Sequence, residues 1–168
     1  DLPLSRGLGD VYKRQIHYFS TASVEMLTSK SRPYFHHKKK MEERLIDSVP
    51  AHKLRIFRLP NVVGHSNNPN TLTNFIYHSI QIGKTDSLDF EAPRELLDIA
   101  KISPYVISSR KSNQVVIRIS GIQCKVGEIV DIMCTKDVKS PDIQKLLSKY
   151  YSLPVSLGKG KHHWKENM

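Results

Sequence analysis

The spacing of apolar residues along this chain predicts an alternation of short strands and helices. Three stretches are rich in β-branched and aromatic residues or alternate apolar with polar positions, as strands do. Five other stretches have apolar residues three and four positions apart, which is the spacing of one helical face. The predicted strands are residues 16–21, 54–59 and 115–119, and the predicted helices are 34–47, 70–82, 100–109, 126–134 and one that begins at Ser140.

Proline and glycine mark the ends of several of these elements. Pro33 suits the first turn of the helix that follows it, and Pro50 prevents that helix from continuing. Gly83 is the expected stop of the next helix. Ser140 is the expected N-cap of the last helix, with Pro141 in its first position.

The same spacing predicts which helical side chains point inward. Between the elements, residues 22–31 and 60–69 are predicted loops, and 94–99 fit either an extended segment or a helix. The apolar positions expected on inner helical faces are Met41, Leu45, Ile46, Leu72, Phe75, Ile76, Ile80, Ile129, Val130, Ile132, Met133, Ile143, Leu146 and Leu147.

Strands that alternate with helices of this length are typical of an α/β fold with a mainly parallel sheet. A complete dinucleotide-binding fold also requires a first strand that runs into a glycine-rich turn and a helix. The early glycines Gly7 and Gly9 follow no predicted strand and open no predicted helix. They therefore do not match the context of a phosphate-binding loop.

Composition narrows the class of protein and of partner. The 168 residues are 39% hydrophobic and 25% charged, which is typical of globular proteins, and no apolar run has the length of a membrane span. The net charge of +10 suits nucleic acid or anionic metabolites. The densest basic cluster, residues 36–40, is followed by Glu42 and Glu43, and the cations lack interleaved aromatic residues. This pattern favours small phosphate-bearing substrates over nucleic acid.

Cysteine and histidine spacing predicts no metal site. Cys124 and Cys134 are too few for a disulfide framework and have no zinc-ligand spacing, so we expect free thiols in a reducing cytoplasm. His36 and His37 are adjacent on a predicted helix, where neighbouring side chains diverge rather than converge on an ion.

The two ends of the chain differ from its middle. Residues 1–15 have no periodicity and contain an adapter-like string, so we expect a non-native leader there. Residues 151–168 form a polar tail that includes His162, His163 and Trp164, which we expect to be solvated.

Tyr34 and Lys38 are the strongest candidates for chemistry. They are four positions apart on a predicted helix, so their side chains project from one face. An ammonium near a phenol favours the phenolate, which is the form that can abstract a proton. A hydroxyl at the end of the preceding strand, from Thr21, Ser20 or Ser23, can complete the set by bonding the substrate oxygen.

The order of these motifs resembles the extended short-chain dehydrogenase/reductase family, the NAD-dependent epimerases and dehydratases that act on nucleotide-linked sugars. The resemblance rests on a strand, Ser-Thr-Ala-Ser-Val at 20–24, Pro-Tyr-x-x-x-Lys at 33–38, and Arg-Leu-Pro-Asn-Val-Val-Gly at 58–64. It covers residues 16–132, which correspond to the second half of such an enzyme. It implies the carboxy-terminal half of a Rossmann-type parallel sheet plus a small mixed substrate-binding subdomain.

The resemblance also implies roles for individual residues. Thr21 stands at the catalytic Ser or Thr, Tyr34 at the acid/base tyrosine, and Lys38 at the lysine that also holds the nicotinamide ribose. The cofactor contacts that the resemblance implies are Tyr34, Lys38, Pro60 and Asn61. The substrate contacts that it implies are Asn61, Asn70, Thr71, Leu72 and Arg94.

For the whole protein, the resemblance implies NAD or NADP as cofactor, a nucleotide-linked sugar as substrate, no nucleic-acid or membrane partner, a cytoplasmic location and a homodimer. Residues 16–64 would belong to the dinucleotide-binding fold and 65–150 mainly to the substrate-binding subdomain. Two alternatives stay open: an NADPH-dependent sugar reductase of the same family, and a non-catalytic basic binding module on the same fold.

Three features depart from the family pattern. Glu25 replaces the tyrosine that is common after Ser-x-x-x-Val, and Lys101 stands where an aspartate is usual. The stretch between Thr21 and Tyr34 is shorter than in most members. A shorter stretch reduces the loop beside the sugar, which bears on both substrate and reaction type.

Overall fold

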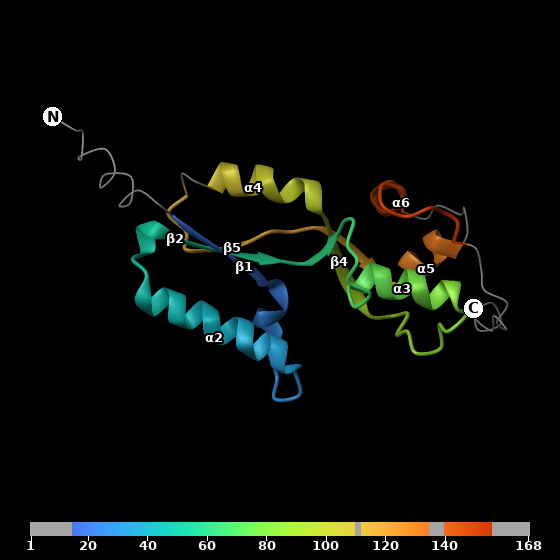
Figure 1. Ribbon diagram of the computed structural model, residues 1–168, viewed down its shortest axis with the longest axis horizontal. Coiled ribbons are helices and arrows are strands. Elements are labelled where there is room, and N and C mark those ends of the chain that lie inside the picture. The colour runs from blue at the N-terminus through green and yellow to red at the C-terminus, as the bar shows by residue number, and fades with distance from the viewer. Residues whose placement is uncertain (1–14, 110–111, 135–139, 156–168) are drawn as a thin grey trace. The chain divides into compact units, whose positions relative to one another are not determined.

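A computed structural model describes residues 15–109, 112–134 and 140–155. All of the expected leader except Gln15 lies outside these residues, and so do the glycines Gly7 and Gly9 and the tail residues His162, His163 and Trp164. The chain divides into two compact units (Figure 1). Among the described residues, unit 1 comprises 15–60, 105–109 and 112–119, and unit 2 comprises 61–104, 120–134 and 140–155.

Unit 1 contains a three-stranded parallel sheet in the order β1-β2-β5. The strands are β1 (Ile16–Thr21), β2 (Leu54–Leu59) and β5 (Val116–Arg118). Parallel strands need a crossover, and helix α2 (Pro33–Ser48) provides it between β1 and β2. Two 3₁₀ helices, η1 (Ala22–Met26) and η2 (Ala51–Lys53), flank α2. The predicted parallel α/β arrangement is confirmed for this sheet.

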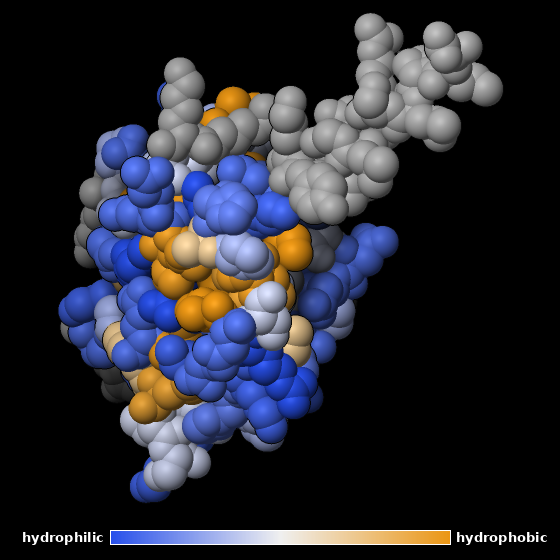
Figure 2. Space-filling view, turned by 90° about the vertical axis from the view of Figure 1, so that its left-hand side faces the viewer, coloured by the Kyte–Doolittle hydropathy of each residue, from blue (hydrophilic) through white to orange (hydrophobic). Residues whose placement is uncertain are grey.

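The central strand of unit 1 carries its apolar core. Leu54, Ile56 and Phe57 of β2 are fully buried, as expected for a parallel strand covered on both faces. The edge strand β1 is different, because Ile16 and Phe19 are 45% and 42% exposed. Within the described residues, β1 pairs with β2 alone. Figure 2 shows one face of the molecule on which apolar surface gathers within a ring of hydrophilic side chains.

Unit 2 contains a mixed sheet in the order β3-β4-β6. Strands β3 (Asn61–Val63) and β4 (Pro93–Asp98) are parallel, and β6 (Ile122–Lys125) pairs with β4 in the antiparallel direction. The helices are α3 (Leu72–Gln81), α5 (Val126–Cys134) and α6 (Pro141–Leu147). Helix η3 (Ile99–Lys101) leads from β4 into α4 (Ile102–Ser108), whose residues from Tyr105 onward belong to unit 1.

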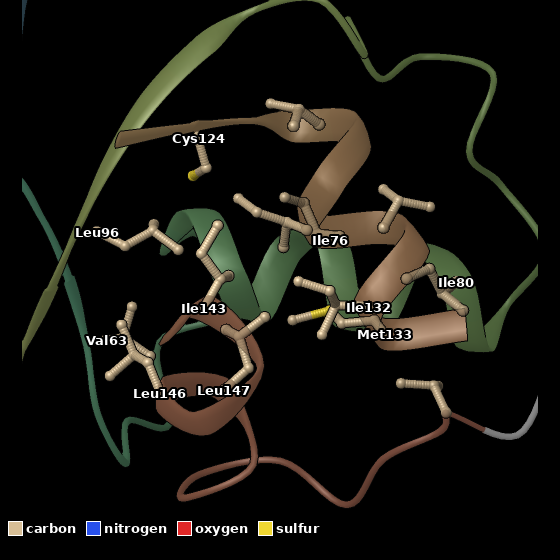
Figure 3. Packing of buried hydrophobic residues seen from close by; sticks show 14 of the residues in the cluster. Val63, Ile76, Ile80, Leu96, Cys124, Ile132, Met133, Ile143, Leu146 and Leu147 are labelled. Carbon is tan, nitrogen blue, oxygen red and sulfur yellow. The ribbon is translucent and has the colours of Figure 1, made fainter. Parts of the chain in front are cut away.

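Helices α3, α5 and α6 bury one apolar cluster together with the sheet of unit 2 (Figure 3). Most of the inward positions predicted for these helices are buried, and each buried Val, Leu or Ile side chain contributes about 1.5–3 kcal/mol by leaving water. The labelled members of the cluster are Val63, Ile76, Ile80, Leu96, Cys124, Ile132, Met133, Ile143, Leu146 and Leu147.

Several elements differ from the sequence-based expectation. Residues 22–26 form η1 rather than a loop, and 61–63 form a strand rather than the start of a loop. The undecided segment 94–99 is mostly strand β4, and β6 was not expected. Two helices are shorter than predicted: α3 begins at Leu72 and α4 at Ile102.

Three single positions also correct the prediction. Phe75 and Ile46 were expected to face inward but are 45% and 48% exposed. Ser140 occupies the N-cap position of α6 but its oxygen accepts no capping bond, and its hydroxyl donates to Glu128 Oε1 at 3.1 Å. The carboxylate is a stronger acceptor than a neutral oxygen, so it takes the hydroxyl proton.

Gly121 lies where two strands of unit 2 approach closely. A Cβ at this position would lie 2.2 Å from the carbonyl oxygen of Leu96, so the backbone of β4 would have to shift. We expect Gly121→Ala to lower the free energy of unfolding by about 2–4 kcal/mol. Gly127→Ala is the matched control. Its Cβ would lie 3.2 Å from Phe90 O, a distance that needs a much smaller shift than the 2.2 Å at Gly121. Equal urea midpoints for the two variants would contradict this expectation.

Candidate active site

Thr21 ends β1 and caps the helix that follows. Its Oγ1 accepts a hydrogen bond from Ser23 N at 3.3 Å, and its backbone is extended, as at other N-caps. A hydroxyl that accepts one bond keeps its own proton for donation to another oxygen. The neighbouring hydroxyl of Ser20 is buried and has no hydrogen-bond partner among the described residues. Thr21 is half-buried and ends the strand, whereas Ser20 is buried. Thr21 is therefore better placed than Ser20 to meet a substrate oxygen.

Tyr34 and Lys38 lie one turn apart at the beginning of α2. The Tyr34 side chain is exposed, with 55% of the residue surface open to solvent. Lys38 Nζ lies 5.8 Å from the centroid of the Tyr34 ring and 4.8 Å from that of Tyr18 on β1. Both distances lie within the range of a cation–π contact. The structure therefore brings the predicted tyrosine and lysine together.

A hydrogen bond connects Lys38 to the strand that carries Thr21. Lys38 Nζ donates to the carbonyl oxygen of Phe19 at 2.9 Å. An ammonium has three donors, so two remain for other acceptors. The beginning of α2 is thereby fastened to the carboxyl end of β1, where ligands bind in open α/β sheets.

Sequence reasoning missed Tyr18 as part of this neighbourhood. Tyr18 is half-buried beneath Lys38, and its pKa is raised above the ordinary value by burial and by the negative charge of Glu42. The sequence gave no specific signal for this contact, because Tyr18 is one aromatic residue within a predicted strand, three positions before its end.

The remaining predicted site residues use their polar groups in local contacts. Pro60 directly follows β2 in unit 1, and Asn61 begins β3 in unit 2, where its Nδ2 donates to Glu95 O at 3.2 Å. Arg94 Nη1 on β4 donates to Pro93 O at 2.8 Å. The start of α3 holds the last three: Asn70 N donates to Asn68 Oδ1 at 2.9 Å, Thr71 Oγ1 to Asn68 O at 3.3 Å, and Leu72 packs on the apolar cluster.

Asn74 organises the loop before α3 and was not singled out from sequence. Its buried Nδ2 donates to Ser66 O and Asn68 O, both at 2.9 Å, and its Oδ1 accepts from Tyr151 OH at 2.6 Å. These bonds fix the backbone that carries Asn70 and Thr71.

A second polar cluster lies at the carboxyl end of β4 in unit 2. Asp98 is buried and accepts from Lys149 Nζ, from Tyr150 OH at 2.6 Å and from Ala100 N at 2.9 Å. Burial raises the pKa of Asp98, but these hydrogen bonds outweigh burial and lower the pKa to about 2. Hydrogen bonding to Asp98, together with burial, raises the pKa of Tyr150 to about 12. The ring of His65 packs edge-on against Tyr150.

The lowered pKa of Asp98 predicts an acid-dependent contribution to stability. The contribution is complete above the ordinary carboxyl pKa near 3.8 and disappears as the pH falls toward about 2. We expect Asp98→Asn to cost about 1–2 kcal/mol at neutral pH, less than the full shift because Lys149 is partly exposed. Unfolding free energies of both proteins should converge as the pH approaches 2. A difference that stays constant across this range would contradict the account.

The cysteines and histidines suggest no additional chemistry. Cys124 and Cys134 are free, and burial raises the pKa of each thiol to about 11, with help from Glu128 and Asp131 respectively. Protonated thiols are poor nucleophiles and poor metal ligands at neutral pH. His36 and His37 are exposed on α2. No group of three His, Cys, Asp or Glu side chains in the described part of the chain could hold a metal ion.

Comparison with known proteins shows a structural likeness without a sequence match. No family model and no curated protein matches the sequence. Among solved structures, the UDP-N-acetylglucosamine 4-epimerase of Methanobrevibacter ruminantium has a TM-score of 0.54 at 20% identity, over 71% of this chain and 46% of that one. The dTDP-glucose 4,6-dehydratase of Bacillus anthracis, in complex with NAD, has a TM-score of 0.52 at 14% identity, over 95% and 64%.

This chain therefore shares its fold with part of a nucleotide-sugar epimerase and part of a nucleotide-sugar dehydratase. The L-threonine 3-dehydrogenase of Trypanosoma brucei shares it, with a TM-score of 0.54 at 15% identity over 94% of this chain and 57% of that one. The fold by itself therefore does not select a sugar substrate. The chain spans between 46% and 64% of the length of these three proteins.

None of the helices in the described part of the chain has the length and apolar content that crossing a membrane requires.

Proposed function

We propose that this chain is the carboxy-terminal part of an NAD(P)-dependent epimerase or dehydratase that acts on nucleotide-linked sugars in the cytoplasm. The observation that carries the proposal is the arrangement of Tyr34 and Lys38. Both lie at the start of α2, and Lys38 is bonded to the strand that ends in Thr21. The likeness of the fold to a nucleotide-sugar epimerase and a nucleotide-sugar dehydratase also supports the proposal.

Each of the three residues then has a defined task. Tyr34 moves the proton of the reacting sugar hydroxyl, and its exposure leaves the phenol open to a ligand. Thr21 donates its free proton to the same substrate oxygen and so orients it. Lys38 keeps a positive charge beside Tyr34 and supports its ionised form during proton transfer.

The donor set fits the nicotinamide end of the cofactor. Lys38 retains two N–H donors after bonding Phe19 O, and ribose hydroxyls are suitable acceptors for them. Pro60 and Asn61, where β2 passes into β3, are the other proposed contacts. When bound, the nicotinamide supplies hydride transfer to or from the sugar carbon.

In unit 2, the proposed substrate contacts are residues that can meet a diphosphate. Arg94 provides a guanidinium, which pairs with phosphate oxygens through several donors. The other members of this proposed set are Asn61, Asn70, Thr71 and Leu72. Asn74 fixes the loop that leads to the last three of them. The excess of positive charge in the chain suits an anionic substrate.

Turnover assays on the complete gene product distinguish the candidate functions. An epimerase or dehydratase converts a UDP- or dTDP-linked sugar with catalytic amounts of NAD or NADP, whereas a reductase consumes NADPH in proportion to product. A non-catalytic basic module gives no turnover, but binds polyanions with an affinity that falls steeply with salt. Conversion with catalytic nicotinamide supports the proposal, and the other two outcomes replace it with the corresponding alternative.

The chain on its own should bind the cofactor poorly. In this fold, a glycine-rich turn and a helix amino terminus hold the cofactor pyrophosphate, and the described residues contain neither next to β1. We expect calorimetric titration of the folded chain with NAD or NADP to show no binding in the micromolar range. Micromolar binding would mean that the placement of Tyr34, Lys38 and Asn61 within the fold is wrong.

A further inference from the structure

Four charged side chains form a connected network within unit 1. Glu42 of α2 is fully buried, and Arg58 of β2 binds both of its oxygens, with Nε 3.2 Å from each and Nη2 2.6 Å from Oε2. Arg58 Nη1 also donates to Glu25 Oε1 at 3.3 Å. Arg118 Nε of β5 donates to Glu25 Oε2 at 3.2 Å. The network thus joins α2, η1 and the neighbouring strands β2 and β5.

Glu25 is the member of this network that lies in η1, immediately after Thr21. A 3₁₀ helix of five residues has poor hydrogen-bond geometry and little stability of its own. Its cap bond, from Ser23 N to Thr21 Oγ1, is long at 3.3 Å, and Val24 is its buried apolar residue. The two carboxylate oxygens of Glu25 attach this helix to two different strands.

We propose that Glu25 is a positioning residue for Thr21. Its carboxylate holds η1 against Arg58 and Arg118, and this contact fixes the backbone from which the Thr21 hydroxyl projects. The role rests on the proposed function, because it matters for turnover only if Thr21 orients a substrate oxygen. It also explains why an acid can stand at position 25: two arginine donors meet there, and a carboxylate can accept from both.

Glu25→Gln is the informative variant. Glutamine has nearly the same size, but its amide has one acceptor oxygen and its NH₂ group cannot accept from the second arginine. Glu43→Gln is the matched control. It makes the same chemical change at an exposed glutamate of α2, whose ion pair is with Lys39 at 3.8 Å and lies outside the network. Arg118→Gln removes the other side of the contact while leaving the pair of Glu42 and Arg58 in place.

The first measurement is amide hydrogen exchange by NMR on the 168-residue chain. We expect Ser23 N–H to exchange about tenfold faster in Glu25→Gln and in Arg118→Gln, while the β2 amides keep their wild-type rates. Glu43→Gln should leave Ser23 unchanged. Unchanged Ser23 exchange in both network variants would overturn the proposal, whatever the protein catalyses.

The second measurement is turnover by the complete gene product. We expect Glu25→Gln to lower kcat about ten- to hundredfold with little change in KM, because a misplaced hydroxyl is felt in the transition state. Glu25→Asp, which keeps the charge, should recover part of this loss, and wild-type kcat in Glu25→Gln would overturn the positioning role. If the wild type shows no turnover while Ser23 still exchanges faster in Glu25→Gln, the proposed function fails and the anchoring of η1 stands.

Discussion

Replacing Tyr34 by phenylalanine in the complete gene product is expected to lower turnover by about 10²–10⁴-fold, the usual worth of a positioned proton-transfer group. The change removes only the phenol oxygen, which is the atom proposed to carry the proton. Because Tyr34 is 55% exposed, the fold should tolerate the variant. The measurement is kcat and kcat/KM with the UDP- or dTDP-linked sugar that the wild type converts best, together with thermal unfolding.

Tyr105→Phe is the matched control for this experiment. Tyr105 is a 43% exposed tyrosine on α4 with no proposed contact to substrate or cofactor. Its turnover should equal that of the wild type. If Tyr34→Phe also retains wild-type turnover, another group must move the proton and the assigned role is wrong.

Glu42→Ala is expected to destabilise the chain by about 3 kcal/mol, because it removes one partner of a buried ion pair. Glu42 is fully buried, and Arg58 would lose its bidentate partner while it remains only 17% exposed. The remaining contact with Glu25, at 3.3 Å, limits the loss. The carboxylate also contributes to the raised pKa of Arg58, chiefly through its hydrogen bonds. Equilibrium unfolding in urea gives the free-energy difference.

Glu43→Ala controls for the loss of a carboxylate from the same helix. Glu43 is the next residue, its side chain is 57% exposed, and its ion pair with Lys39 has the geometry of a weak surface pair. We expect a change within about 0.5 kcal/mol. Similar losses for Glu42→Ala and Glu43→Ala would show that burial of the Glu42 pair contributes nothing.

The elements with strong local signals were predictable from the sequence. Helix α2 begins at Pro33 and ends before Pro50, as the two prolines required. Helix α5 matches its predicted bounds, Val126–Cys134, and buries each of its four predicted inward residues. Gly83 has a positive φ of 67° just after α3, which suits the expected stop.

The elements that depend on distant partners were not predictable. Strand β3 has three residues and begins with an asparagine, so its strand character comes from pairing with β4. Strand β6 contains Gln123 and Lys125 and is specified by its antiparallel contact with β4. Short polar segments of this kind carry little intrinsic preference, and tertiary contacts decide their structure.

The same limit applies to the candidate site. The spacing of Tyr34 and Lys38 predicted that they share a face, and the structure places them together. The burial of Glu42 and its pairing with Arg58 could not be foreseen, because an acidic residue on a charged helix is usually solvated. Glu25 was visible only as a departure from the family pattern. Its contacts with Arg58 and Arg118 join residues far apart in sequence.

The most direct test of the proposed function follows deuterium from a nucleotide-linked sugar. The complete gene product is incubated with UDP- and dTDP-sugars that carry deuterium on the reacting ring carbon, in the presence of NAD or NADP. We expect the label to pass to the nicotinamide during turnover, where rapid quenching detects it, and then to return to the sugar as the nicotinamide is reoxidised; transfer should be about 10²–10⁴-fold slower in Tyr34→Phe. Turnover during which the quenched nicotinamide carries no label, or label transfer at the same rate in both proteins, would contradict the proposed function.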